Sequence, residues 1–229
     1  MQPFVTHRGK LAVLDWTDVN TDLIIPARYL KRIERTGFGP LLFADKRYAP
    51  AGAPEVDDPE RHGPENPEFP LNKPALQGAT ILVVGRNFGC GSCREHAVWA
   101  VMQAGFRAII APVLGEGFAD IFESNAFNNG LLVIELSQAD WDAFAAAGRA
   151  NPGRAEATID LRAQTIALHP DRDAASRPEP TFSFRVPESH RHRLLQGLDA
   201  IAETLVHEPE IHRYEQAATA WSQASGTRT

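Results

Sequence analysis

The feature that most constrains the fold is a buried strand that runs directly into a glycine-rich turn and then into a helix. The strand is the β-branched run Ala-Thr-Ile-Leu-Val-Val at 79–84. The turn at 85–96 reads Gly-Arg-Asn-Phe-Gly-Cys-Gly-Ser-Cys-Arg-Glu-His, and small apolar residues then recur at helical spacing until Gly105. This order predicts a parallel sheet with crossover helices, because parallel neighbours need a connection that returns to the same edge.

The same pattern continues on both sides of this unit. A helix over 118–127 should separate strands at 107–111 and 131–136, and Ser137 should cap a helix that runs to Ala147. Outside this core, alternating or β-branched runs predict strands at 10–14, 157–161, 165–168 and 182–186. The fold class is therefore α/β.

The remaining segments predict one folded body followed by a C-terminal tail. Residues 49–70 are rich in proline and acids and predict a long exposed loop. A helical tail should start at Pro187, with one apolar stripe of Leu194, Leu195, Leu198, Ile201 and Leu205. We expect a body at 1–206 and a C-terminal helical tail at 207–229 whose end is frayed.

Composition excludes several classes of function. The formal net charge of −6 disfavours nucleic acid and anionic membranes as partners, since both attract clustered Lys and Arg. No apolar run is long enough to span a bilayer, and the N-terminus lacks the apolar core of a signal peptide. The chain has two cysteines, so a disulfide scaffold is not expected. These features predict a cytoplasmic protein.

The turn at 85–96 is the best candidate for a site. Gly89 and Gly91 permit backbone conformations that other residues avoid, and a helix start with Arg94 suits a carboxylate ligand. Ser92 has two open roles: it caps the helix together with Glu95, or it faces a ligand.

Competing motif interpretations differ in strength. A dinucleotide fingerprint lacks its third glycine, since Arg94 stands there, and a P-loop lacks its Lys-Ser/Thr. A thiol redox pair of Cys90 and Cys93 remains an alternative, although the aromatic residue that often precedes such a pair is absent.

The octapeptide at 89–96 resembles the Gly-Cys-Gly-Ser-Ser-Arg-Glu-His motif of the small subunits of 3-isopropylmalate dehydratase, in the aconitase superfamily. Further motifs agree in family order over nearly the whole chain, and they lie at residues 18–26, 29–31, 35–39, 118–122 and 197–201. This chain departs from the family pattern at Cys93, which replaces a serine, and at 112–118, where the loop is longer.

The resemblance implies the swivelling β/β/α domain found at the C-terminus of aconitase. It also implies a hydro-lyase of leucine biosynthesis that isomerises 2-isopropylmalate, a small hydroxy-dicarboxylate, by dehydration and rehydration. A separate large subunit would be the partner and would carry the [4Fe–4S] cluster, so this chain would bind no metal or cofactor itself. The two departures leave a related 2-hydroxy diacid, such as citramalate or dimethylmalate, as an alternative substrate.

The resemblance assigns residue roles as well. Ser92 is expected to act as the catalytic base, while Cys93 and Arg94 are expected to bind a substrate carboxylate. The loop residues Tyr29, Leu30, Lys31 and Arg35 are expected to lie near the variable substituent of the substrate.

Overall fold

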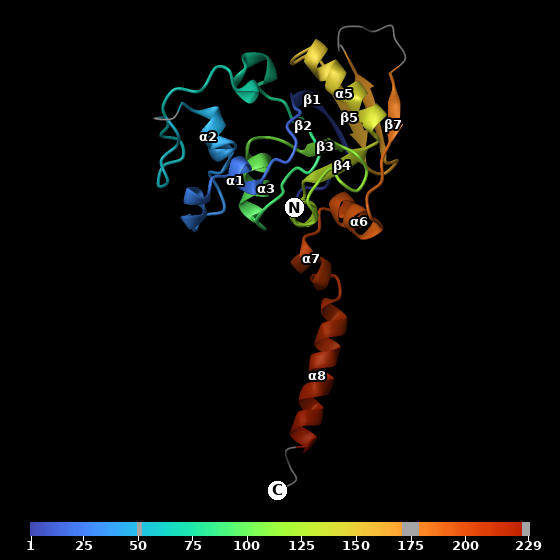
Figure 1. The fold of residues 1–229 in the computed structure, drawn as a ribbon. Helices are drawn as coiled ribbons and strands as arrows, with labels where there is room; N and C mark the ends of the chain where they lie inside the picture. The colour runs from blue at the N-terminus through green and yellow to red at the C-terminus, as the bar shows by residue number, and fades with distance from the viewer. Residues whose placement is uncertain (50–51, 171–178, 226–229) are drawn as a thin grey trace.

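The fold is built on one mixed β-sheet. A computed structural model describes residues 1–49, 52–170 and 179–225, and within these ranges seven strands follow the order β4-β3-β2-β1-β5-β6-β7 (Figure 1). The strands are β1 (Thr6–Leu14), β2 (Ile81–Val84), β3 (Ala108–Pro112), β4 (Leu132–Leu136), β5 (Glu156–Asp160), β6 (Thr165–His169) and β7 (Thr181–Ser183). Each agrees with a predicted strand to within a few residues.

The sheet changes character at its central strand. β1 pairs in parallel with β2, and β2, β3 and β4 continue this parallel half. On its other edge β1 pairs antiparallel with β5, followed by β6 and β7. The predicted parallel core is therefore confirmed, and its strands all end on the side where the glycine-rich turn begins.

Helices complete the layers around the sheet. The α-helices are α1 (Thr21–Ile24), α2 (Ala44–Arg47), α3 (Glu95–Gln103), α4 (Asp120–Asn129), α5 (Gln138–Ala150), α6 (Glu188–Gln196), α7 (Ala200–Leu205) and α8 (Glu208–Ser225). Short 3-10 turns occur at η1 (Ala27–Lys31), η2 (Gly39–Leu41), η3 (Pro70–Asn72) and η4 (Pro74–Leu76). The predicted cap of α5 is confirmed, because the Ser137 side chain accepts a hydrogen bond from the backbone N–H of Asp140.

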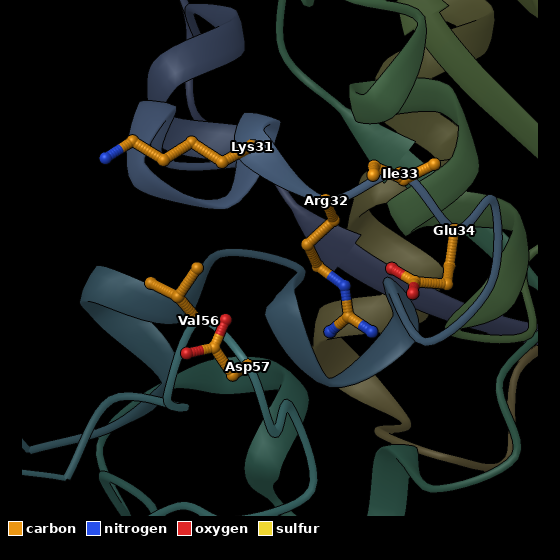
Figure 2. Close-up of a pocket in the computed structure, with 6 residues that line it drawn as sticks. All are labelled: Lys31, Arg32, Ile33, Glu34, Val56 and Asp57. Carbon is orange, nitrogen blue, oxygen red and sulfur yellow. The ribbon is translucent and has the colours of Figure 1, made fainter.

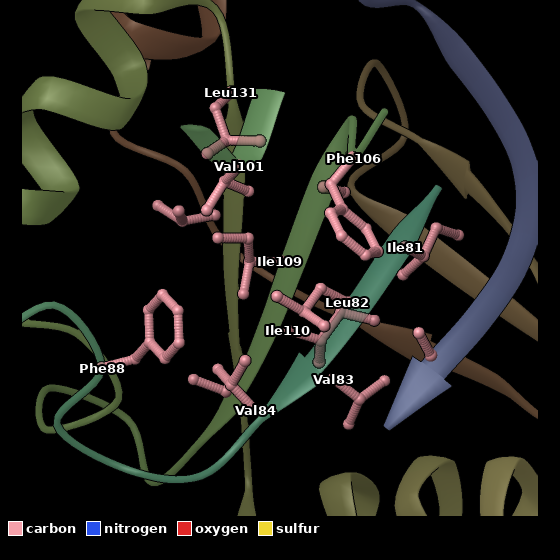
Figure 3. Close-up of a cluster of buried hydrophobic side chains, with 14 of the residues drawn as sticks. Ile81, Leu82, Val83, Val84, Phe88, Val101, Phe106, Ile109, Ile110 and Leu131 are labelled. Carbon is pink, nitrogen blue, oxygen red and sulfur yellow. The ribbon is translucent and has the colours of Figure 1, made fainter. Parts of the chain in front are cut away.

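The apolar core holds the strand ends that carry the turn. Side chains of β2 and β3 pack with Val101 of α3 and with Phe88 and Phe106, all buried (Figure 3). On α5, the indole Nε1 of Trp141 donates a 2.8 Å hydrogen bond to the backbone oxygen of Val84, the last residue of β2. Burying each large apolar side chain contributes about 1.5–3 kcal/mol, so the end of β2 is a firm base for the turn.

The helical tail differs from its prediction. The prediction of a single apolar stripe is wrong, because Gly197 adopts φ 70° and ends α6 soon after the buried Leu194. Ile201 and Leu205 are then 72% and 56% exposed, and α8 projects away from the sheet (Figure 1). The helix continues to Ser225, and residues 226–229 lie outside the described ranges. The division at residue 206 stays a prediction.

The proline-rich segment is only partly the exposed loop that was predicted. About half of its described residues are exposed, and the Tyr29 hydroxyl donates a 2.8 Å hydrogen bond to the backbone oxygen of Pro54. Phe69, at its C-terminal end, is 3% exposed and packs against Trp16 and Phe43. The loop is therefore anchored to the body at both of these points.

Candidate active site

The turn leaves β2 through glycines that the surrounding backbone requires. A Cβ on Gly85 would lie 2.4 Å from the backbone oxygen of Trp16, and a Cβ on Gly89 would lie 2.2 Å from the Phe122 side chain. Gly89 and Gly91 have φ of 81° and 91°, in the region that L-residues rarely adopt. These glycines bring residues 90–94 out of the core and onto an open edge.

One side of the turn lies against residues 18–21. The backbone N–H of Gly89 donates to the oxygen of Val19, and the backbone N–H of Thr21 donates to the oxygen of Cys90, each over 2.8 Å. The Thr21 hydroxyl also donates to the Ser92 carbonyl oxygen at 3.0 Å. Two of the sequence motifs therefore form one unit in space.

The opposite side of the turn lies against residues 116–119. The backbone N–H groups of Asn87 and Phe88 donate to the oxygens of Glu116 and Gly117 at 2.8 and 2.9 Å. The N–H of Ala119 returns a 3.1 Å hydrogen bond to Phe88. The beginning of the turn is thus held between two segments that are distant in sequence.

Ser92 does not cap the helix. The N-cap residue of α3 is Arg94, which makes no side-chain cap hydrogen bond, so the capping alternative for Ser92 is wrong. The Ser92 side chain is exposed, and no described residue hydrogen-bonds its hydroxyl. Its carbonyl, by contrast, is fixed by Thr21, so the hydroxyl is free to face a ligand while the backbone is held.

Arg94 is positioned by an acid from the neighbouring motif. Its side chain is 15% exposed, and Nη1 donates to the Oδ1 of Asp22 in α1. A guanidinium has five N–H donors in a fork, so one such contact leaves others available for a carboxylate. The pair orients Arg94 beside Ser92 and Cys93.

The two residues after Arg94 have structural partners. The Glu95 Oε1 atom accepts a 2.8 Å hydrogen bond from the Asn129 side chain of α4. The His96 ring packs 5.4 Å from the Phe38 ring and 4.6 Å from Trp99, between ring centroids. Burial lowers the pKa of His96, so the neutral imidazole is favoured there.

The thiols lack the properties of a redox pair. Both cysteines are free; Cys93 is exposed and Cys90 is half-buried. Burial raises the pKa of the Cys90 thiol, and the Asp18 carboxylate raises it further. A reactive thiol at a helix start would need a lowered pKa, so the raised pKa of Cys90 does not favour the redox alternative.

The predicted substrate loop divides into buried and exposed residues. Tyr29 is fully buried, and burial raises the pKa of its phenol. Leu30 is half-buried, whereas Lys31 is exposed and lines a pocket of ≈ 440 Å³ (Figure 2). Arg35 is exposed, and its guanidinium carbon lies 5.4 Å from the centre of the Trp99 ring in α3. This loop therefore contacts the helix that the turn initiates.

The structure adds three candidates that the sequence did not single out as site residues: Thr21, Asp22 and Arg32. Arg32 points into the pocket beside Lys31 (Figure 2), and its buried Nε and Nη1 atoms have no hydrogen-bond partner among the described residues. Thr21 and Asp22 lie within a motif that the sequence analysis had already identified, but no local sequence pattern predicts their contacts with the turn.

The described part of the chain has neither a cluster of metal-ligating side chains nor a membrane-spanning helix. Within 1–49, 52–170 and 179–225, His, Cys, Asp and Glu side chains form no group of three or more that could hold a metal ion. Among the same residues, every helix is too short or too polar to cross a membrane.

Comparisons with known proteins agree along the chain. Residues 1–139 match the aconitase C-terminal domain family. The 3-isopropylmalate dehydratase small subunit of Desulforapulum autotrophicum is 44% identical over 96% of this chain and 98% of that protein. The protein of the same name from Teredinibacter turnerae is 47% identical over 94% of this chain and 93% of its own.

The fold has a solved counterpart. The crystal structure of a 3-isopropylmalate dehydratase from Methanocaldococcus jannaschii is similar with a TM-score of 0.55 at 22% identity. The likeness covers 92% of this chain and 99% of that one. Together with the family match, it confirms the predicted α/β fold of the swivelling domain.

Proposed function

This chain belongs to the 3-isopropylmalate dehydratase small-subunit family of the aconitase superfamily, and we propose that its turn supplies the proton-transfer and carboxylate-binding groups of the reaction. The enzyme is a hydro-lyase that interconverts 2-isopropylmalate and 3-isopropylmalate in leucine biosynthesis. Its curated relatives share this name, which favours isopropylmalate over citramalate or dimethylmalate.

Ser92 is the proposed base, and the observation that carries the proposal is its exposed hydroxyl on an immobilised backbone. Thr21 fixes the Ser92 carbonyl at 3.0 Å, so the hydroxyl can be aimed at a substrate carbon without reorganising the turn. To accept a proton from that carbon, the serine oxygen must first be an alkoxide, which carries a negative charge. The N-terminus of α3 and the Arg94 guanidinium would stabilise that charge once water is excluded.

Arg94 is the proposed carboxylate ligand. Its guanidinium is largely covered and held by Asp22, so it is pre-oriented before a substrate arrives. The exposed Cys93 lies between Ser92 and Arg94, where its backbone N–H and thiol can contact the same carboxylate. A thiol is a weaker donor than the serine hydroxyl of the family, so the backbone and Arg94 carry most of this binding.

Lys31 and Leu30 are proposed to lie near the variable substituent of the substrate. Lys31 lines the pocket at the edge of the loop, and Arg35 links the loop to α3 through Trp99. Tyr29 has a different proposed role. Because Tyr29 is buried and hydrogen-bonded to Pro54, it would support the conformation of the loop from the core and would not contact the substrate.

The partner is a large dehydratase subunit, as the small-subunit names of the relatives imply. We propose that the [4Fe–4S] cluster lies on that subunit, as the resemblance to the family implies. When bound, the cluster would supply a Lewis acid for the departing hydroxyl. We also place the subunit in the cytoplasm, where the exposed Cys93 thiol would stay reduced.

The test is turnover by the assembled enzyme. The chain should be co-expressed with its large subunit and assayed for interconversion of the two isopropylmalates, with citramalate and dimethylmalate as competing substrates. Ser92→Ala should lower kcat by roughly 10³-fold, the scale of a lost proton-transfer group. Arg94→Lys should raise KM and lower kcat/KM by roughly 10²-fold, because the fork is lost while the charge remains.

Matched controls guard against indirect effects. Ser124→Ala removes an exposed hydroxyl on α4, and Arg8→Lys alters an exposed arginine on β1, away from the turn, so both should retain wild-type kinetics. Retention of more than about a tenth of kcat in Ser92→Ala would overturn the assignment of the base. Higher kcat/KM on another diacid would overturn the substrate assignment.

A further inference from the structure

A single carboxylate on β4 holds the loop that joins β3 to α4. The Glu135 Oε2 atom accepts a hydrogen bond from the backbone N–H of Gly115 at 2.6 Å. Its Oε1 atom accepts a second one from the N–H of Gly117 at 2.9 Å. Hydrogen bonds to a charged acceptor are about twice as strong as neutral ones, so this is a firm attachment for an otherwise exposed loop.

The loop is shaped to bring its backbone to that carboxylate. Gly115 has φ 87°, a conformation that favours glycine. A Cβ on Gly117 would lie 2.8 Å from the Cβ of Ala111 and 2.9 Å from the Glu135 Oε1 atom. Gly117 is therefore required for the close approach, while Gly115 favours the backbone conformation of the loop. This loop is the segment that is longer here than in the family pattern.

The same loop carries the backbone oxygens that hold the turn. Glu116 accepts from the Asn87 N–H at 2.8 Å, and Gly117 accepts from the Phe88 N–H at 2.9 Å. Gly117 thus donates to Glu135 through its backbone N–H and accepts from Phe88 through its carbonyl oxygen. A continuous chain of contacts runs from the Glu135 carboxylate to a point four residues before Ser92.

We propose that Glu135 is a positioning residue for the dehydratase reaction, acting through the loop at 113–117 on the turn that bears Ser92. The proposal rests on the proposed function of that turn. Loss of the carboxylate leaves at least one of the Gly115 and Gly117 N–H groups without its acceptor, loosens the loop, and weakens one of the two supports of residues 87–88. Proton transfer depends on placement to within a fraction of an ångström, so kcat is affected more than KM.

The experiment compares Glu135→Gln with a matched amide substitution in the assembled enzyme. The control is Glu123→Gln. Glu123 and Glu135 both line a second pocket of ≈ 440 Å³, separate from the one beside Lys31, but the Glu123 carboxylate accepts no hydrogen bond from the described residues of the loop. Burial raises the pKa of Glu123, and the neighbouring Glu135 carboxylate raises it further, so the two side chains share one electrostatic environment. The acid at Asp120 is left unchanged in both variants.

Two readouts separate positioning from general damage. Glu135→Gln should lower kcat by roughly 10-fold with KM within about 2-fold, and Glu123→Gln should keep the wild-type values. Amide hydrogen exchange should accelerate in peptides that cover 85–89 and 113–119 of Glu135→Gln, but not in β5 or β6. A variant that is only less stable would exchange faster throughout the chain.

The outcomes distinguish this proposal from the one on which it rests. An inactive wild-type complex with an intact cluster would overturn the proposed function, and the role of Glu135 with it. An active wild type in which Glu135→Gln leaves both kcat and the exchange of residues 85–89 unchanged would overturn the Glu135 proposal alone.

Discussion

The Thr21 hydroxyl donates a 3.0 Å hydrogen bond to the backbone carbonyl of Ser92, a residue 71 positions away in the sequence. The backbone N–H of Thr21 also binds the Cys90 oxygen at 2.8 Å, so a single buried residue contacts the turn on both sides of Gly91. Gly91 has φ 91°, which local sequence alone does not enforce. Thr21 therefore fixes the peptide from which the Ser92 side chain projects.

Thr21→Val should weaken the site without removing a catalytic group. The substitution keeps the shape of the side chain but leaves the Ser92 carbonyl without its donor. We expect the free energy of unfolding to fall by about 1 kcal/mol and kcat to fall by roughly 5-fold. Urea unfolding and steady-state kinetics of the complex measure the two effects. Thr17→Val, at an exposed position nearby, is the control, and equal kinetics in both variants would contradict the role of Thr21.

Gly89→Ala should test close packing separately from backbone strain. A Cβ at Gly89 would lie 2.2 Å from Phe122, whereas one at Gly78 would have no heavy atom within 4 Å. Both glycines have positive φ, so Gly78→Ala should cost only about 1 kcal/mol of strain. Gly89→Ala should lower the free energy of unfolding by about a further 1–3 kcal/mol, which is the usual effect of overpacking a core. Thermal unfolding that ranks the two variants equally would show that Phe122 moves aside freely.

The two thiols should differ in their rates of alkylation. Thiolate is the reactive form, and Cys90 is half-buried with a raised pKa, while Cys93 is exposed. N-ethylmaleimide at about pH 7.5 should therefore modify Cys93 at least roughly 5-fold faster, as followed by peptide mass spectrometry. Cys93→Ser should abolish the fast phase and keep dehydratase activity, since the family carries serine there. A fast phase that persists in this variant would refute the assignment.

His96 should make stability depend on pH. Burial lowers its pKa, Glu95 acts in the opposite direction, and Arg94 adds to the lowering. The folded state therefore favours the neutral ring. Its contribution is fully present above the unfolded value of about 6.5 and is lost as the pH falls through the folded value.

His96→Gln removes this contribution. Between about pH 7.5 and about pH 5.5, the free energy of unfolding should fall more in the wild type than in the variant. His7 and His190 also have lowered pKa values, but they are common to both proteins and cancel in the comparison. A pH-independent difference between the two proteins would contradict the prediction.

The local sequence pattern was enough to predict the strand and helices that carry the site. The β-branched run before Gly85 gave β2, the small apolar residues after Arg94 gave α3, and Ser137 gave the start of α5. Each of these signals lies within a few residues of the structure it predicts, because burial periodicity and helix caps are local properties. The motif series likewise identified the family.

The arrangement of the site was decided by tertiary structure. Asp22 binds Arg94, Thr21 binds Ser92, and Glu135 binds the loop beside Phe88, all across many residues of sequence. These contacts depend on where the parallel strands end and on backbone N–H and C=O groups, which every residue carries and which leave no mark in the sequence. The same reason explains why Ser92 did not become a helix cap: α3 begins after it, at Glu95, and its hydroxyl is left exposed for chemistry.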